Sequence, residues 1–181
     1  MEKAVLLVVD VQNCIVDENL YNEKRVISNI QSLLSEARAS GLEVIYVRHN
    51  DGEGSDMEYG SDGWQIYAAI APMEGERIFD KQYNSAFLKT GLEEYLKELK
   101  AKTIILVGLQ TEYCIDATCK AAFEHGFQLI IPEETNSTFD NEYLSGERLY
   151  HYYNYKIWNN RFAKVLPTPE VIASIGTIYK V

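Results

Sequence analysis

Two long runs of apolar residues constrain the fold of this chain more than any other feature. Residues 4–9 (AVLLVV) and residues 103–109 (TIILVGL) lack the alternation of polar and apolar positions that marks a half-exposed strand. A strand that is apolar on both sides is covered on both faces, which is typical of the centre of a parallel sheet. The two runs therefore predict an α/β protein whose sheet lies between helices.

Amphipathic segments separate the apolar runs along the chain. The first segment ends at Gly41, and its apolar residues share one helical face. They are Val26, Ile30, Leu33, Leu34 and Ala37. Residues 91–99 and 115–125 show similar spacing, and such alternation builds right-handed crossovers between parallel strands. We therefore predict a single domain over residues 1–181, with three αβα layers around a mostly parallel, Rossmann-like sheet.

Three reactive side chains lie where predicted strands end. Asp10 follows the first apolar run, and Lys81 closes a short extended run that begins at residue 77. Cys114 follows the second long run and directly precedes the helical segment 115–125. Ligands of open α/β sheets bind at the carboxyl edge of the strands. We therefore expect Asp10, Lys81 and Cys114 to converge at that edge.

Cys114 is a candidate nucleophile because of its place at the start of a helix. Unpaired backbone N–H groups and the positive end of the helix dipole favour the thiolate there. The alternative is that Cys114 is only a small buried residue. From ordinary pKa values, transfer of the thiol proton to Asp10 is uphill by about 6 kcal/mol. A nearby Lys81 would stabilise both the thiolate and the ionised Asp10, so its net effect depends on geometry.

Three short motifs carry a family resemblance that covers most of the chain. They are Asp10-x-Gln12, then Lys81 with Ser85-Ala86-Phe87 and Thr90-x-Leu92, and finally Gly108-x-x-Thr111-x-x-Cys114-Ile115-x-x-Thr118. In this order they resemble the isochorismatase-like cysteine hydrolase superfamily, which includes nicotinamidases and N-carbamoylsarcosine amidases. The resemblance implies a catalytic triad of Asp10, Lys81 and Cys114. It also implies an oxyanion hole from the backbone N–H groups of Gln110 and Cys114, with a cis peptide before Gln110.

The activity implied by the resemblance is cleavage of a C–N bond in a small amide or ureido compound. Cys114 would attack the carbonyl carbon, and the thioester would be hydrolysed after ammonia or an amine leaves. One alternative is an isochorismatase-type vinyl ether hydrolase, which does not require the cysteine. Another is a non-catalytic small-molecule-binding homologue, since a fold alone does not establish activity.

Charge and composition exclude several other classes of function. The formal net charge of -10 and the lack of a basic cluster argue against nucleic-acid and anionic-membrane partners. The sequence shows no signal-peptide pattern and no apolar stretch near the roughly 20 residues that span a bilayer. We therefore expect a soluble, cytoplasmic enzyme with a small-molecule substrate. The resembled family commonly forms dimers or tetramers, so a homo-oligomer is also expected.

No cofactor or metal is expected. The three cysteines form no CxxC pair, so neither a disulfide framework nor a thiolate zinc site is indicated. Metal-containing nicotinamidases carry an Asp-x-His motif and a further histidine after the second strand. This chain has His49-Asn50-Asp51 there and no second histidine until His125, which falls in the last turn of a predicted helix. The motif is absent, and nicotinamidase activity is therefore not expected.

Candidate substrate contacts come from loops and from the motifs themselves. Residues 49–64 form a glycine-rich, acidic segment without periodicity, which predicts a long loop that shapes the binding site. Trp64 and Tyr67 are candidate pocket walls, although such aromatic residues also cover cores. Gln12 is a candidate pocket amide, with an ordinary loop residue as the alternative. Phe87 and Tyr113, which lie within the motifs, complete the set.

Overall fold

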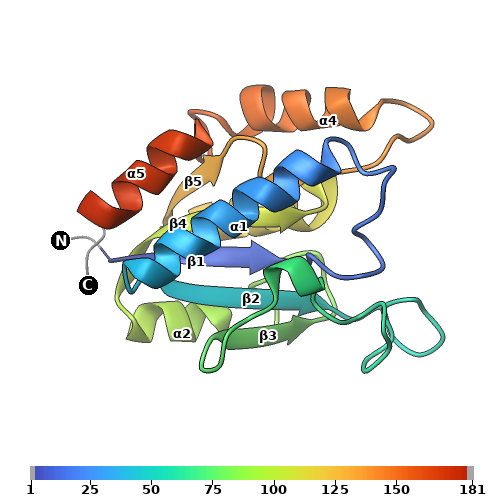
Figure 1. Cartoon of the computed structure of the whole chain (residues 1–181), viewed down its shortest axis with the longest axis horizontal. Helices are drawn as coiled ribbons and strands as arrows, with labels where there is room; N and C mark the ends of the chain where they lie inside the picture. Colours follow the sequence, from blue (N-terminus) through green and yellow to red (C-terminus); the bar gives the residue numbers. More distant parts are fainter. Residues whose placement is uncertain (1–2, 179–181) are drawn as a thin grey trace.

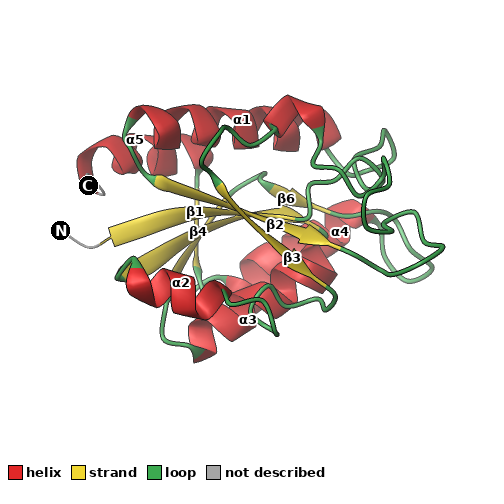
Figure 2. Ribbon diagram, turned by 90° about the horizontal axis from the view of Figure 1, so that it is seen from below, coloured by secondary structure: helices red, strands yellow, loops and turns green. Residues whose placement is uncertain are grey.

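The protein has a central parallel sheet between two layers of helices in the computed structural model, which describes residues 3–178 (Figures 1 and 2). The strand order is β3-β2-β1-β4-β5-β7, and β6 pairs with the end of β4. All of these pairs are parallel. The strands are β1 (Lys3–Val9), β2 (Glu43–His49), β3 (Arg77–Lys81), β4 (Ala101–Leu109), β5 (Gln128–Pro132), β6 (Asn136–Ser137) and β7 (Lys164–Leu166).

The helices divide between the two faces of the sheet. Helices α1 and α5 lie side by side on one face, and α2 and α3 cover the other (Figure 2). The α-helices are α1 (Glu23–Ala39), α2 (Leu92–Glu98), α3 (Asp116–Glu124), α4 (Gly146–Tyr152) and α5 (Thr168–Ile178). The shorter helical segments are the 3₁₀ turn η1 (Ala68–Ile70) and the π-helical segments η2 (Thr111–Ile115) and η3 (Tyr153–Trp158). The predicted three-layer αβα architecture is confirmed.

Strand β1 shows why the apolar runs required this architecture. Val5, Leu7 and Val9 belong to the core beneath α2 and α3. Leu6 and Val8 belong to the core beneath α1 and α5. Successive side chains of a strand point to opposite faces, so a strand buried on both faces needs apolar residues at every position. The helix predicted over residues 115–125 begins at Asp116, because the residues before it form the π-helical segment η2.

A close approach between β1 and β4 shapes the carboxyl edge of the sheet. Gly108 pairs with Val9 and has a φ of 133°, which favours glycine. A Cβ atom at Gly108 would lie 1.9 Å from the Val9 carbonyl oxygen, so a larger side chain cannot be accommodated without backbone movement. The close approach brings the end of β4 beside Asp10. Within residues 3–178, none of the helices has the length and apolar character needed to cross a membrane.

Candidate active site

The three reactive residues meet at the carboxyl edge of the sheet. Asp10 directly follows β1, and Lys81 is the last residue of β3. Strand β2 lies between these two strands, so the long lysine side chain extends past β2 to reach Asp10. Cys114 lies in η2, which follows β4 on the other side of β1. The end of β1, where Asp10 lies, is therefore between the ends of β3 and β4.

The contacts among these residues are short. The Lys81 Nζ atom lies 2.5 Å from Asp10 Oδ2 and 3.2 Å from Cys114 Sγ. Both members of the ion pair are buried, with side chains that are 0% exposed for Lys81 and 1% exposed for Asp10. A buried charge is costly unless it is paired, so the contact between these two residues offsets part of the cost of burying them.

Burial also controls the protonation of the thiol. Desolvation, followed by the negative charge of Asp10, raises the pKa of Cys114 to about 12, while Lys81 acts in the opposite direction. Burial raises the pKa of Asp10 as well, against the effect of Lys81. The helix N-terminus was expected to favour a thiolate, but burial has the larger effect on this cysteine. Burial therefore favours the neutral thiol in the resting site.

The turn after β4 contains a backbone donor four residues before Cys114 in the chain. The Leu109–Gln110 peptide is cis. The Gln110 carbonyl accepts hydrogen bonds from the N–H groups of Tyr113 and Ile115, each at 3.2 Å. The Gln110 N–H itself has no hydrogen-bond acceptor within the described part of the chain. It is therefore available to a ligand oxygen, as an oxyanion hole requires.

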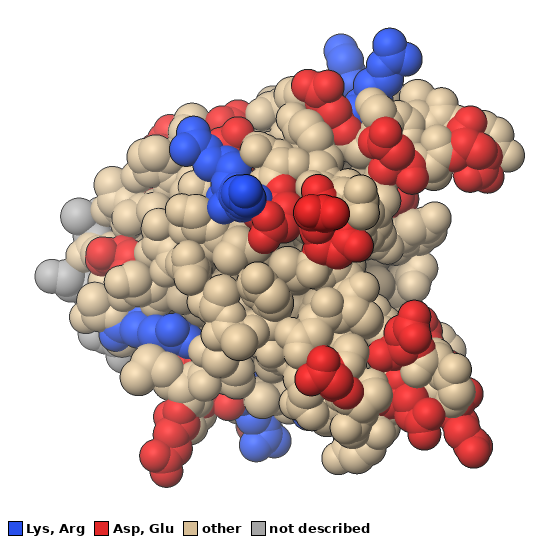
Figure 3. Space-filling view, turned by 45° about the vertical axis from the view of Figure 1, so that its right-hand side comes forward, with Lys and Arg blue, Asp and Glu red and all other residues tan. Residues whose placement is uncertain are grey.

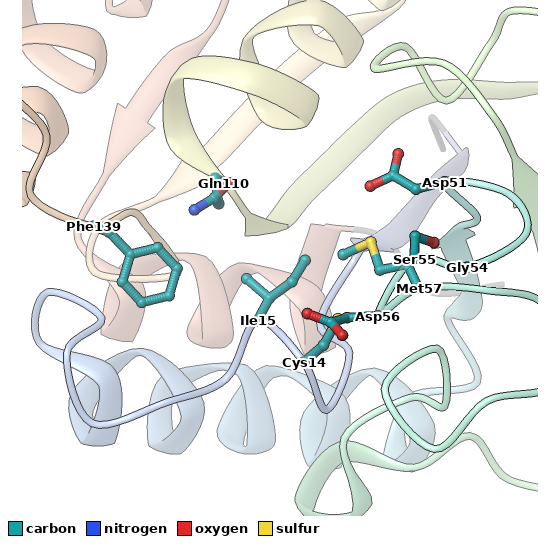
Figure 4. A pocket seen from close by; sticks show the side chains of 9 residues that line it. All are labelled: Cys14, Ile15, Asp51, Gly54, Ser55, Asp56, Met57, Gln110 and Phe139. Carbon is teal, nitrogen blue, oxygen red and sulfur yellow. The ribbon is translucent and has the colours of Figure 1, made fainter.

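A cavity of about 550 Å³ opens beside this turn (Figure 4). Asp10, Lys81 and Cys114 do not line it, but two neighbours of the reactive group do: Gln110, four residues before Cys114 in the chain, and Asp51, which contacts the buried His49. Phe139 and Ile15 supply apolar wall, and the remainder comes largely from the loop after β2. The lining residues are Cys14, Ile15, Asp51, Gly54, Ser55, Asp56, Met57, Gln110 and Phe139.

Comparison with known proteins agrees with this arrangement. The model of the Isochorismatase domain matches residues 4–169 of the chain. The chain belongs to the isochorismatase family. An uncharacterized family protein, YrdC of Bacillus subtilis (strain 168), is 29% identical over 94% of this chain and 95% of its own length. A structure described as a putative family hydrolase from Chromobacterium violaceum has a TM-score of 0.90 at 26% identity, and covers 98% of this chain and 96% of that one.

Relatives with named activities include hydrolases. Streptothricin hydrolase of Streptomyces noursei is 31% identical over 75% of this chain, although the match spans only 54% of that protein. N-carbamoylsarcosine amidase of Arthrobacter sp is 29% identical over 84% of this chain and 62% of its own length. This chain is therefore an isochorismatase-family hydrolase, and its homologues include amidases.

Gln12 has a structural position in this isochorismatase-family protein. Its side chain is completely buried. The amide nitrogen donates to the carbonyl oxygens of His49 and Trp64, both at 2.9 Å, and Oε1 accepts from the His49 N–H at 2.7 Å. These bonds join the end of β1 to β2 and to the following loop. The expectation that Gln12 contacts the substrate is therefore corrected: its amide serves backbone groups.

The expected aromatic pocket walls are also placed elsewhere. Trp64 is buried and packs under the Arg48 guanidinium, which lies 3.6 Å from its ring centroid. Tyr67 packs against the core beneath α1 and α5. Phe87 stacks on His125, with ring centroids 5.1 Å apart, near the start of β5 rather than at the carboxyl edge. None of the three lines the cavity beside Gln110. Hydrophobicity alone could not distinguish a core position from a pocket wall.

Two residues near the thiol remain available to a substrate. Tyr113 is half exposed and precedes Cys114 in η2. Asn84, which the sequence motifs did not single out, is exposed and places its Oδ1 atom 3.9 Å from Cys114 Sγ. Its position in the loop after β3, three residues beyond Lys81, is the signal that could have identified it.

Three side chains of the site carry groups that could ligate a metal ion. The possible ligand atoms of Asp10, His49 and Cys114 lie within 4.8 Å of one another. The Lys81 ammonium contacts all three, at 2.5 Å, 2.8 Å and 3.2 Å. A metal cation bound by these residues would meet the lysine charge at contact distance. The arrangement therefore does not fit a metal while Lys81 is in place.

Proposed function

We propose that this protein is a cysteine amidase that cleaves the C–N bond of a small amide or ureido compound through a thioester. The contact of the Cys114 thiol with a buried Asp10–Lys81 ion pair carries the proposal. A carboxylate in this position can accept the thiol proton, and the Gln110 N–H can bind the developing oxyanion. Amidase activity in the names of homologous proteins supports the same class.

In the first half of the reaction, Cys114 attacks the carbonyl carbon of the substrate. At pH 7, prior formation of a thiolate with a pKa of about 12 would cost on the order of 7 kcal/mol. Transfer of the proton to Asp10 during the attack avoids a free thiolate. The Lys81 ammonium remains charged and stabilises the sulfur as its proton leaves. The oxyanion is stabilised by the Gln110 N–H.

In the second half, Asp10 returns the proton to the leaving nitrogen. Cleavage of the C–N bond releases ammonia or an amine and leaves the acyl group on Cys114 Sγ. A water molecule then transfers its proton to the Asp10 carboxylate and attacks the thioester carbonyl. The C–S bond breaks, the acid product departs, and the proton on Asp10 returns to the sulfur. One carboxylate thus serves both halves of the cycle.

The charge of the cavity indicates which amides are suitable. Asp51 and Asp56 are the charged residues in its lining, which contains neither lysine nor arginine. Acidic side chains also gather on the side of the molecule toward which the strands point (Figure 3). A carboxylate on the substrate would be repelled there. We therefore favour uncharged or cationic amides over ureido acids and other anionic substrates.

The test is release of ammonia or amine from a panel of small amides that share a reacting group and differ in charge. Wild type is compared with Cys114→Ala, and Cys119→Ala is the matched control because it alters a cysteine outside the site. Turnover that vanishes only in Cys114→Ala supports the proposal. Vinyl ether hydrolysis that persists in Cys114→Ala, with no amide turnover by wild type, would contradict it.

A further inference from the structure

A histidine and an aspartate extend the buried ion pair toward the cavity. His49 is the last residue of β2 and pairs in register with Lys81 of β3. Its side chain is 10% exposed. Nδ1 lies 2.8 Å from Lys81 Nζ, and Nε2 lies 2.6 Å from Asp51 Oδ1. The imidazole therefore bridges the ammonium at the centre of the site and a carboxylate in the cavity wall.

The number of protons fixes how these groups are bonded. A lysine ammonium has three N–H donors and no acceptor. Three acceptors surround Lys81 Nζ: Asp10 Oδ2, Cys114 Sγ and His49 Nδ1. His49 Nδ1 must therefore be unprotonated, which leaves the imidazole proton on Nε2, directed at Asp51. In this arrangement Lys81 donates to His49 Nδ1, and His49 Nε2 donates to Asp51 Oδ1.

The backbone of His49 is held as firmly as its ring. The Gln12 amide binds both its N–H and its carbonyl oxygen, at 2.7 Å and 2.9 Å. Gln12 is thereby connected to the proposed site through His49, although it does not face the cavity. A lysine side chain is flexible, and its ammonium contacts Asp10 and Cys114 together only if its end is held in place. The third hydrogen bond, to His49, supplies that constraint.

We propose that His49, oriented by Asp51, is a positioning residue that fixes the Lys81 ammonium between Asp10 and Cys114. This proposal rests on the proposed amidase function for its effect on turnover. Its structural part, the protonation pattern, does not depend on any substrate. Asp51 has a side chain that is 58% exposed and also lines the cavity, so a bound ligand would contact the outer end of the chain of hydrogen bonds.

The first test is direct observation of the tautomer. NMR of protein labelled with ¹⁵N-histidine distinguishes a protonated from an unprotonated ring nitrogen, and loss of the signal in His49→Asn assigns it. We expect unprotonated Nδ1 and protonated Nε2 at neutral pH. A proton on Nδ1 of neutral His49 would overturn the proposal, because Lys81 could not then donate to it.

The second test measures the effect of His49 on the thiol. Alkylation of Cys114 by iodoacetamide is followed in a Cys14→Ser background, which removes the exposed cysteine. His49→Phe removes the acceptor, and we expect alkylation to slow by about tenfold, as for loss of one charge-assisted hydrogen bond. His49→Asn offers an oxygen near the Nδ1 position and should restore most of the rate. His151→Phe, the same change at an exposed histidine, is the control.

The outcomes separate this proposal from the proposed function. If an amide is hydrolysed, His49→Phe should lower kcat by about tenfold with little change in KM, and His49→Asn should recover it. Unchanged alkylation and kcat in His49→Phe would overturn the positioning role even if the protein is an amidase. If the tautomer and the alkylation rates are as expected but no amide is hydrolysed, the positioning role of His49 is upheld and the proposed amidase function is contradicted. If His49→Phe does not fold, the tautomer and His49→Asn still decide the question.

Discussion

Two cysteines that lie only five residues apart show what distinguishes a reactive site from the protein core. Cys114 in η2 contacts Lys81 at the carboxyl edge of the sheet, whereas Cys119 in α3 is completely buried in the core beneath α2 and α3. Burial raises the pKa of each to about 12. A perturbed pKa therefore does not identify the nucleophile in this protein. The contact with an ion pair and the partial exposure of its side chain distinguish Cys114.

Removing each thiol in turn should produce the largest contrast. We expect Cys114→Ala to lower amide turnover by at least about 10³-fold, because it removes the nucleophile. Cys119→Ala should keep turnover within about threefold, because its cost falls mainly on core packing. Initial rates with the same amide, at equal concentrations of folded protein, measure the contrast. Equal loss in both variants would mean that Cys114 acts only through stability.

The next prediction tests the Asp10–Lys81 ion pair, which contacts Cys114. Asp10→Asn preserves shape but removes the proton acceptor, so we expect turnover to fall by about 10²- to 10⁴-fold. It also leaves the Lys81 ammonium buried without a counter-charge, at a cost of about 3–5 kcal/mol in the free energy of unfolding. Urea denaturation measures this cost. Asp116→Asn, beside Cys119 in α3, is the matched control and should have a much smaller effect on turnover.

Much of the site could be predicted from sequence because strand ends converge. The ends of β1 and β3 and the turn after β4 place Asp10, Lys81 and Cys114 together in any parallel sheet of this strand order. The role of Gln12 could not be predicted, because its partners are backbone groups 37 and 52 residues away. The bridge between His49 and Lys81 likewise depends on the β2–β3 register, which no local pattern specifies.

The pKa of Cys114 and the residues that line the cavity could not be predicted from local sequence patterns either. The raised pKa of Cys114 results from burial by several elements, whereas its position at a helix start predicted the opposite shift. Phe139 and Ile15 reach the cavity from irregular segments without periodicity. Trp64 and Phe87, which were candidate substrate contacts, are both buried: Phe87 lies in the core beneath α2 and α3, and Trp64 packs beneath the Arg48 guanidinium.

Access to the thiol provides a smaller but independent contrast. In the native protein, we expect iodoacetamide to modify Cys114 at least about tenfold faster than Cys119, because alkylation of a core cysteine requires local opening. Cys14, which is exposed, supplies a reference for reaction without burial. Peptide mapping by mass spectrometry gives all three rates in one sample. Comparable rates for Cys114 and Cys119 would contradict the difference in access.

The smallest effect concerns a property that the two cysteines share. A pKa of about 12 in the folded protein, against an ordinary value of 9.0, favours the folded state below pH 9. This contribution is lost as the pH rises from 9 toward 12, at up to about 1.4 kcal/mol per pH unit for each thiol. Between pH 9 and 10.5, the free energy of unfolding should therefore fall less steeply in Cys114→Ala and in Cys119→Ala than in wild type.

Urea denaturation at several pH values, with reductant present, measures how steeply the free energy of unfolding changes with pH. Cys14→Ala is the control, because Cys14 is a more exposed thiol whose pKa is raised only to about 11. Because burial is the largest cause of the shift at both Cys114 and Cys119, we expect similar changes in slope from the two variants. A change confined to Cys119→Ala would mean that Lys81 offsets burial at Cys114 more fully than the structure indicates. The thiol of Cys114 would then ionise more readily, and attack by a preformed thiolate would replace transfer of its proton during attack.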